Sequence, residues 1–400
     1  MMLFRVVSGL IAISLIVLTC AYVYRRLVRD VTQRRGLRIA GMVVFFAPIV
    51  AVPVLRLRLT ATSVPPALNV AVLGLLGFIL FTMMALLIID TARWVATRRF
   101  KKAPTAEDEM REVARDGEKA PPENPERRLL LSRAVAAGAV TFAGGSSVYG
   151  LYSAMTPPEV TVVPVKLPGL PKALDGFTIV QLTDIHVGSI IQEKFLDMLT
   201  DVANGQRPDL IAITGDLVDG TPGQLGRYVA RLQNLRAHHG VFFCSGNHDY
   251  YSGWEAWAEA LPGIGFNLLR NRCVAIGDAG ASFDLLGVED LGARWGAGEY
   301  DLEKATAGRD IGRASVLMAH QPSNLPEVSA KHIGLQLSGH THGGQLFPAT
   351  VIGSMIWGSR NAGLSKYENT WQYTSRGCGF VGPPMRVGAP PEVVKIVLTT

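Results

Sequence analysis

Three long apolar stretches near the start of the chain restrict its possible folds more than any other feature. They run roughly over 3–24, 37–55 and 68–89, and the runs GLIAISLIVLTCAYVY and VAVLGLLGFILFTMMALLII contain no charged residue. Each stretch is long enough to cross the ~30 Å hydrocarbon core of a bilayer. One such stretch could be the buried helix of a soluble protein, but three in succession favour three transmembrane helices within residues 1–90.

Charge is distributed unevenly along the chain. Residues 1–157 carry 20 Lys and Arg against 10 Asp and Glu, whereas residues 158–400 carry 19 against 23 and hold all eight His. The loops 25–38 and 91–128 are rich in Arg and Lys, so the positive-inside rule predicts that both are cytoplasmic. The N-terminus and the segment after residue 152 are then expected outside, in a multi-pass protein of the cell membrane.

A linker and a less apolar segment connect the three apolar stretches to residues 158–400. Residues 91–128 mix basic, acidic and proline residues, which predicts a charged, disordered cytoplasmic linker. Residues 129–157 then form either a fourth transmembrane helix or an export signal. Arg127 and Arg128 precede three Leu in ERRLLLSR, an arrangement that resembles a twin-arginine signal and would make the twin-arginine translocation machinery a partner. The alternative is the ordinary basic flank of a fourth helix.

The four cysteines give no metal motif. Cys20, Cys244, Cys273 and Cys378 form no CxxC pair, and Cys20 lies in a predicted membrane helix. A Cys273–Cys378 disulfide is possible outside the cell, and the spacing alone does not decide whether it forms.

From residue 177 onward, short apolar runs alternate with helical patterns. FTIVQLTD, DLIAITGD, GVFFCSGNHD, SFDLLGVED, ASVLMAH and LQLSGHTH each predict a strand buried on both faces. Residues 193–205 and 225–235 predict helices between them. This alternation predicts an α/β fold.

Polar residues gather where these strands end, which is where the loops of an α/β sheet converge on a ligand. They are Asp184, His186, Asp216, Asp219, Asn247, His248, His320, His340 and His342. Carboxylate, imidazole and amide groups together suit Mn, Fe or Zn better than Ca or Mg. The set is too large for one ion, whereas two divalent ions sharing a carboxylate would use it.

DIH, GDLVD, GNHD, a single His after a strand and GHTH, in this order, resemble the calcineurin-like metallophosphoesterases. The tail SRGCGFVGPPMRVGAPPEVVKIVL and the membrane segments are similar to the membrane-associated bacterial branch, which includes twin-arginine-exported cell-wall phosphoesterases and the "transmembrane protein with metallophosphoesterase domain" group. The resemblance implies that residues 158–400 form a metallophosphoesterase domain with the four-layer α/β/β/α sandwich of that superfamily.

The resemblance also implies a role for each motif residue. One ion would be held by Asp184, His186 and His342, and Asp216 would bridge to the other. That second ion would take the remaining ligands, which are Asn247, His320 and His340. The ions would lower the pKa of a bridging water to near ~7, and the resulting hydroxide would attack phosphorus.

Two further residues would assist the reaction without binding metal. His248 would give a proton to the leaving oxygen, and Asp219 would orient it. Asp249 is a rival for that orienting role, or a helix cap, and Asp219 could instead cap the following loop. Arg376 could contact phosphate or simply lie on the surface.

Other residues are expected to have no role in the chemistry. His238, His239 and His332 are assigned to the surface, and Glu289 and Asp290 have no evident function.

These features predict a membrane-anchored hydrolase of phosphodiester or pyrophosphate bonds, acting outside the cytoplasm on an envelope or lipid-linked substrate. Some relatives of this kind hydrolyse UDP-2,3-diacylglucosamine, so the alternative is such a hydrolase facing the cytoplasm. A second alternative is a non-catalytic metal-binding sensor or scaffold. A protein phosphatase is disfavoured because Gly220 and Thr221 stand where an Arg clamp would follow Asp219. A nucleic-acid partner is disfavoured because the second part is mildly acidic.

Overall fold

The computed structural model describes residues 2–59, 65–99, 124–278, 280–291, 299–322 and 324–400. The chain forms two compact units, and each is described by itself. One comprises residues 1–55 and 71–148, and the other comprises 56–70 and 149–400. Residues 100–123 of the predicted linker 91–128 lie outside the described ranges, whereas 91–99 and 125–128 at its two ends are helical, contrary to the prediction.

Helices cover all four apolar stretches. They are α1 (Met2–Tyr24), α2 (Arg35–Leu59), α3 (Pro66–Arg99) and α5 (Pro125–Met155). Among the described residues, α3 and α5 are the two helices long and apolar enough to cross a membrane. Cys20 and Val23 of α1 pack against Phe45 of α2 and Ile79 of α3 in a small apolar core. The three-plus-one transmembrane arrangement and its orientation stay predictions.

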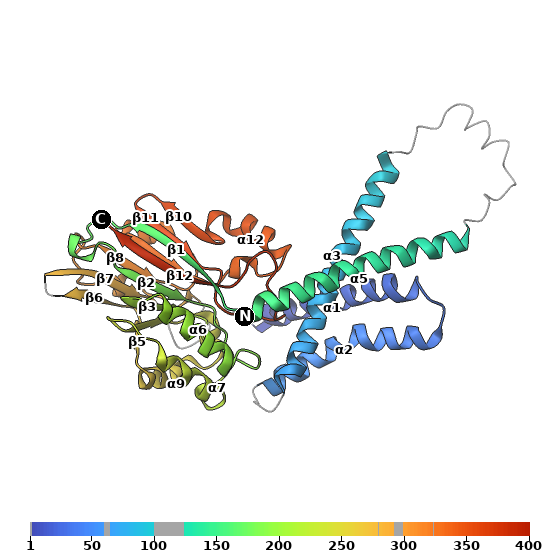
Figure 1. The fold of residues 1–400 in the computed structure, drawn as a ribbon, viewed down its shortest axis with the longest axis horizontal. Coiled ribbons are helices and arrows are strands. Elements are labelled where there is room, and N and C mark those ends of the chain that lie inside the picture. Colours follow the sequence, from blue (N-terminus) through green and yellow to red (C-terminus); the bar gives the residue numbers. More distant parts are fainter. Residues whose placement is uncertain (1, 60–64, 100–123, 279, 292–298, 323) are drawn as a thin grey trace. The chain divides into compact units, whose positions relative to one another are not determined.

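The second unit contains two six-stranded mixed sheets (Figure 1). In spatial order, the first sheet consists of β1 (Glu159–Lys166), β12 (Glu392–Thr399), β2 (Thr178–Leu182), β3 (Leu210–Thr214), β4 (Val241–Cys244) and β5 (Phe266–Leu268). The second consists of β10 (Gly363–Tyr367), β11 (Thr370–Thr374), β9 (Leu335–Ser338), β8 (Ser315–Met318), β7 (Ala281–Gly287) and β6 (Arg272–Asp278). Strands β2 to β5 run parallel, as do β7, β8, β9 and β11.

Short helices follow most of these strands. They are α6 (Glu193–Gly205), α7 (Pro222–Val229), α8 (Asn247–Tyr251), α9 (Trp254–Ala260), α10 (Leu302–Thr306), α11 (Leu325–Ala330) and α12 (Ala349–Trp357). Helix α6 has the bounds predicted from its sequence. The predicted helix over 225–235 is α7 continued by a 3₁₀ turn over Ala230–Asn234.

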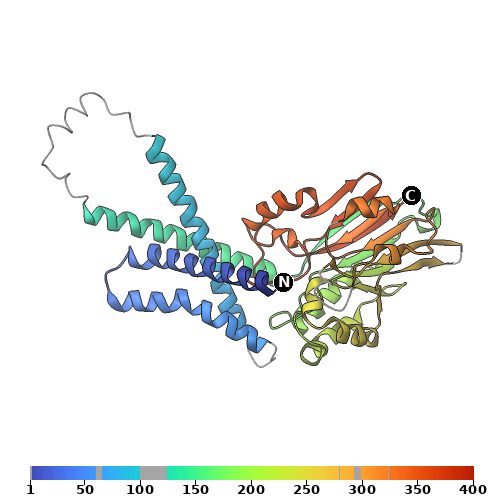
Figure 2. The same ribbon diagram turned by 180° about the vertical axis from the view of Figure 1, so that it is seen from behind.

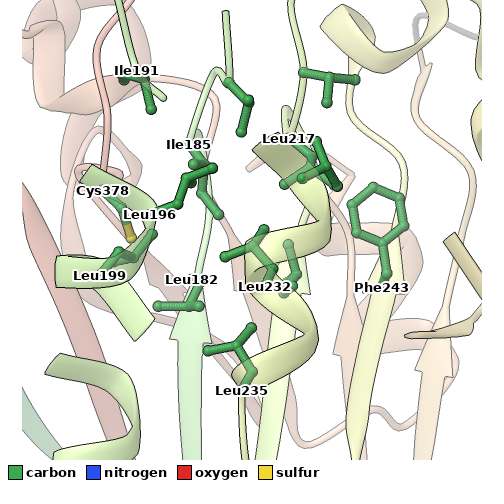
Figure 3. Close-up of a cluster of buried hydrophobic side chains, with 14 of the residues drawn as sticks. Leu182, Ile185, Ile191, Leu196, Leu199, Leu217, Leu232, Leu235, Phe243 and Cys378 are labelled. Atoms are coloured by element: carbon green, nitrogen blue, oxygen red, sulfur yellow. The ribbon is translucent and has the colours of Figure 1, made fainter. Parts of the chain in front are cut away.

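Successive side chains of each strand point to opposite faces of the sheet and so belong to different hydrophobic cores. Ile179 and Leu210 point into the layer between the sheets, where they join Phe283 and Leu335. Val180, Ile213 and Phe243 belong to a different cluster, which includes Leu196 and Leu199 of α6. Figure 3 shows Leu182 and Ile185 beside Leu196 and Leu199 in this cluster. The outer face of the second sheet buries Leu317 against Leu302 of α10 and Val328 of α11. The α/β prediction is confirmed, and both ribbon views show the two sheets packed face to face (Figure 2).

Candidate metal centre

The candidate ligands come from both sheets, and each lies within a few residues of the carboxyl end of a strand. Asp184 and His186 follow β2, Asp216 follows β3, and Asn247 follows β4 in the first sheet. From the second sheet, His320 follows β8, and His340 and His342 follow β9. Because neighbouring parallel strands end at the same edge, these side chains converge there.

The structure brings these residues together in overlapping groups. Asp184, His186 and His342 form one group whose ligand atoms lie within 4.8 Å of one another, and Asp216, His320 and His340 form another. A third group combines His186 and Asp216 with His248. Asp216 therefore belongs to groups on both sides of the site, as a bridging carboxylate would.

Distances within the groups suit metal coordination. His186 Nε2 and His342 Nε2 face each other at 3.1 Å, and His342 Nε2 lies 3.3 Å from Asp184 Oδ1. His320 Nε2 lies 3.2 Å from Asp216 Oδ2. Ligand atoms that share one ion at ~2.0–2.2 Å stand ~3 Å apart, so these gaps are the size that a transition-metal ion requires.

A buried ligand atom of the set lacks a partner. Asn247 Oδ1 is shielded from solvent and has no hydrogen-bond partner among the described residues, whereas His320 Nδ1 donates to the Thr214 carbonyl at 2.9 Å and its Nε2 faces Asp216. An unpaired buried polar atom is costly, and a ligand that satisfies it is favoured. The residues present therefore fit a metal ion.

Backbone strain is concentrated on the ligands. Asp184, His186, Asp216, His340 and His342 all have positive φ, between 50° and 71°. Non-glycine residues adopt this conformation rarely and at a cost, and such residues cluster at functional sites. The fold holds five of the seven candidate ligands in a conformation that local sequence alone would not favour.

Glycines next to the ligands make room for the carboxylates. A Cβ on Gly339 would lie 2.1 Å from Asp184 Oδ2, and one on Gly246 would lie 2.2 Å from Asp216 Oδ1. In place of side chains, backbone N–H groups reach the acids: His340 N donates to Asp184, and His248 N donates to Asp216 Oδ1 at 2.8 Å. The glycines that precede Asn247 and His340 are thus needed for the close approach of the two carboxylates.

His248 and Asp219 stand at the open side of the site. His248 Nδ1 lies 2.6 Å from Asp219 Oδ1, and the two side chains keep 28% and 35% of their surface exposed. The other carboxylate oxygen of Asp219 lies 3.2 Å from His186 Nδ1. Asp219 therefore contacts both a candidate ligand and the predicted proton donor, and its link to His186 was not foreseen.

Asp249 has a different environment from the one it would need to orient His248. Its carboxylate accepts from the backbone N–H groups of Asp216, Leu217, Val218 and Gly246 at 2.8–3.2 Å. Asp249 thus fixes the loop that carries the shared carboxylate and caps the start of α8. Burial and the charge of Asp216 raise the pKa of Asp249 to about 7.

Charges inside the site shift several ionisations. Burial would lower the pKa of His186, but the carboxylates of Asp219, Asp216 and Asp184 outweigh it and raise that pKa to about 9. Burial and the neighbouring His320 lower the pKa of His340 to about 4. His340 is therefore neutral and able to ligate at neutral pH, whereas His186 must lose a proton to do so.

Sequence reasoning missed Arg386. Its guanidinium is fully buried, lies 3.0 Å from His342 Nδ1, and donates to the carbonyls of His342 and Gly379 at 3.0 and 2.9 Å. It thereby holds the loop of a candidate ligand in place. The available signal was that Arg386 is the one charged residue within GCGFVGPPMRVGAPP.

The remaining residues singled out from the sequence lie outside the cluster. Arg376 pairs with Glu392 at 2.9 Å and with Glu159 at 3.3 Å, so its partners are acids. Glu289 accepts from Arg270 and Trp254. The surface assignments of His238 and His332 agree with their exposure, and His239 is half-buried. All four cysteines are free, so the possible Cys273–Cys378 disulfide is not formed.

Comparison with known proteins agrees with this geometry. A family model described as calcineurin-like phosphoesterase matches residues 177–344. An uncharacterized metallophosphoesterase of Helicobacter pylori (strain J99) is 35% identical over 277 residues, which cover 68% of this chain and 73% of that protein. This chain belongs to the calcineurin-like phosphoesterase family.

Two further relatives of this phosphoesterase differ in how much they match. The "Transmembrane protein with metallophosphoesterase domain" of Bos taurus is 36% identical over 285 residues, covering 68% of this chain and 63% of that protein. The uncharacterized metallophosphoesterase YkuE of Bacillus subtilis is 30% identical over 273 residues, covering 66% and 93%. Family membership makes the chain a metal-dependent phosphoesterase. The bovine relative's name and the two candidate spans suggest membrane association.

Proposed function

We propose that this phosphoesterase is membrane-anchored, uses two divalent transition-metal ions, and hydrolyses phosphodiester or pyrophosphate bonds of a lipid-linked or envelope substrate. The observation that carries the proposal is that Asp216 belongs to two ligand groups, one with His186 and His248 and one with His320 and His340. A single carboxylate between two groups is the arrangement that two ions ~3.5–4 Å apart require. Mn, Fe and Zn suit the mixed nitrogen and oxygen donors.

Mostly buried residues would hold the metal ions, and partly exposed residues would transfer the proton. Asp184, His186 and His342 would hold one ion, and Asn247, His320 and His340 the other, with Asp216 between them. When bound, the ions supply positive charge for the phosphate oxygens and acidify a water molecule. The fold keeps the donors rigid because most of them are buried and backbone N–H groups fix both aspartates.

His248 is placed to move a proton at the open side. Its Nδ1 faces Asp219, so Nε2 is free to point toward a leaving oxygen, and the carboxylate would stabilise the imidazolium. This pair supports an enzyme over a metal-binding scaffold, since a structural metal site has no need for a solvent-open imidazole held by an acid. The general-acid role is the proposal's most specific element.

Location follows from charge. The basic loops favour a catalytic domain outside the cytoplasm, reached either by ordinary insertion of α5 or by a twin-arginine route. An inverted orientation would make a cytoplasmic lipid-precursor pyrophosphatase the leading alternative.

The test uses the full chain, purified in detergent and loaded with Mn²⁺. Wild type is expected to hydrolyse bis(p-nitrophenyl) phosphate and to hold up to two ions by elemental analysis. Asp216→Asn should lose most activity and metal, whereas Asp278→Asn, a change at an exposed acid in β6, should lose neither. Normal turnover and metal content in Asp216→Asn would refute the binuclear assignment.

A further inference from the structure

Helix α12 has an unusual distribution of side chains. The seventeen residues from Gly343 to Ser359 include no Asp, Glu, Lys or Arg, and α12 itself has no buried residue. Its large apolar side chains are exposed, with Met355 at 79% and Ile356 at 70%. A surface helix of a soluble protein normally turns such residues toward the core.

The helix instead turns two small residues and one Trp inward. Thr350 and Gly353 lie on the less exposed face with Trp357, at helical spacing. A Cβ on Gly353 would lie 2.7 Å from Asn361 Oδ1, so only glycine allows this close approach. The opposite face presents its apolar residues outward, and these are Val351, Ile352, Met355 and Ile356. A contiguous apolar face of this kind marks an interaction surface.

We call this outward face the α12 face (Val351, Ile352, Met355 and Ile356), and the inward face of the same helix lies beside the metal centre. The helix begins seven residues after His342, and the Trp357 ring lies 6.1 Å from the His340 ring. Whatever covers the α12 face is therefore brought close to the candidate metal ligands.

The end of α5 connects the same region to a candidate membrane span. Val387 pairs with the segment that precedes α12, since Phe347 N donates to the Val387 carbonyl at 2.9 Å. The neighbouring Arg386 N donates to the Gly150 carbonyl of α5, also at 2.9 Å, and a Cβ on Gly150 would lie 2.9 Å from Val387 Cγ2. One short segment thus packs against both the last turns of α5 and the base of α12.

Exposed side chains on those last turns have the character of a membrane interface. Tyr149, Tyr152 and Met155 are 57%, 68% and 40% exposed. Tyrosine is enriched at the headgroup level of bilayers because its ring is apolar and its hydroxyl is polar. Only three residues separate the end of α5 at Met155 from the start of β1 at Glu159, a gap that spans at most ~14 Å.

We propose that the α12 face inserts into the surface of the bilayer and so holds the metal centre at the headgroup level, where it acts on the phosphoester of a membrane-embedded amphiphile. The inference rests on the proposed function and adds that the substrate lies in the membrane and not in solution. Interfacial helices of this kind bury their apolar face ~5–10 Å into the headgroup and acyl boundary.

The test compares two substrates with the same leaving group. Full-length protein is reconstituted in phosphatidylcholine–phosphatidylglycerol vesicles and given either methyl p-nitrophenyl phosphate in solution or hexadecyl p-nitrophenyl phosphate in the membrane. The combined variant Ile352→Ser, Met355→Ser and Ile356→Ser should lose about tenfold or more on the hexadecyl ester and stay within about twofold of wild type on the methyl ester. Ile311→Ser, at an apolar residue 66% exposed elsewhere, is the matched control and should change neither.

The outcomes separate this inference from the proposed function. If wild type hydrolyses neither ester, the proposed function fails. If it hydrolyses both and the triple variant loses neither or loses both equally, insertion of the α12 face is wrong.

A second measurement does not depend on activity. A fluorophore on Met355→Cys should be quenched by lipids brominated near the headgroup, and one on Ile311→Cys should not. A Met355→Cys probe that lipids leave unquenched, with self-association of the protein, would assign the face to a second copy and overturn the inference.

Discussion

Replacing Asp249 by Asn tests whether this residue supports the metal centre through the backbone. Each carboxylate oxygen accepts two N–H groups: Oδ2 those of Asp216 and Gly246, and Oδ1 those of Leu217 and Val218. An Asn side chain keeps one oxygen and puts an NH₂ group where the other was. Two buried N–H groups would then face a donor and lose their acceptor.

The expected loss follows from those two groups. At pH 8.5 the Asp249 carboxylate is ionised despite its raised pKa of about 7. A hydrogen bond to a charged group contributes ~1.5–3 kcal/mol, so two lost bonds should cost about 3–6 kcal/mol of folding free energy at that pH. For a unit of this size, a change of 1 kcal/mol moves the melting temperature by ~2–4 °C, which predicts a fall of at least about 6 °C. Metal content and turnover should fall as well, because the loop that holds Asp216 loosens.

Thermal unfolding in detergent measures the first effect, and elemental analysis and chromogenic-diester turnover measure the others. Asp219→Asn is the matched comparison: its side chain is partly exposed and accepts no backbone N–H in the described structure, so turnover should fall with little change in melting temperature. An Asp249→Asn protein that melts and binds metal like wild type would refute the backbone role argued for Asp249.

Further predictions concern the acid, the protons and the topology. His248→Ala should keep its metal but lose ~10²–10⁴ in turnover, less with better leaving groups, and loss of metal would instead make it a ligand. Metal binding at pH 7.5 should release protons, because the raised pKa values of His186 and His320 keep both side chains charged without metal. Calorimetry in buffers of different ionisation enthalpy measures the number of protons released, and a value of zero would contradict this prediction. Alkaline phosphatase fused after residue 160 should be active; an inactive fusion would invert the orientation. Replacing Arg127 and Arg128 by Lys should retain the phosphoesterase domain in the cytoplasm if the segment is a twin-arginine signal, and normal export would refute that interpretation.

The candidate ligands could be predicted from the sequence because each is recognised by the residues immediately around it. Each stands at the end of a short apolar strand, and parallel strands of one sheet necessarily end at a common edge. The alternation of such strands with helical patterns predicted the α/β fold, and the ordered motifs at the strand ends carried the resemblance to the family. The helix over 193–205 was predictable for the same reason, because its 3.6-residue period lies within one segment.

Other features needed contacts between residues far apart in the chain. The part played by Asp249 depends on N–H groups some thirty residues upstream, and that of Arg386 on a carbonyl and an imidazole 44 residues away. A buried charge and an exposed one look alike in sequence, and only the fold decides which atoms surround them.

The sequence by itself determined which strand end carries each candidate ligand and where the apolar helices lie, because both depend on the spacing of neighbouring residues, and its motifs carried the resemblance to the family. Only the tertiary structure showed that α12 turns Thr350 and Gly353 inward and Met355 and Ile356 outward. A short apolar helix has no polar face to reveal its orientation, so the packing of Gly353 against Asn361 decides which side meets the surroundings.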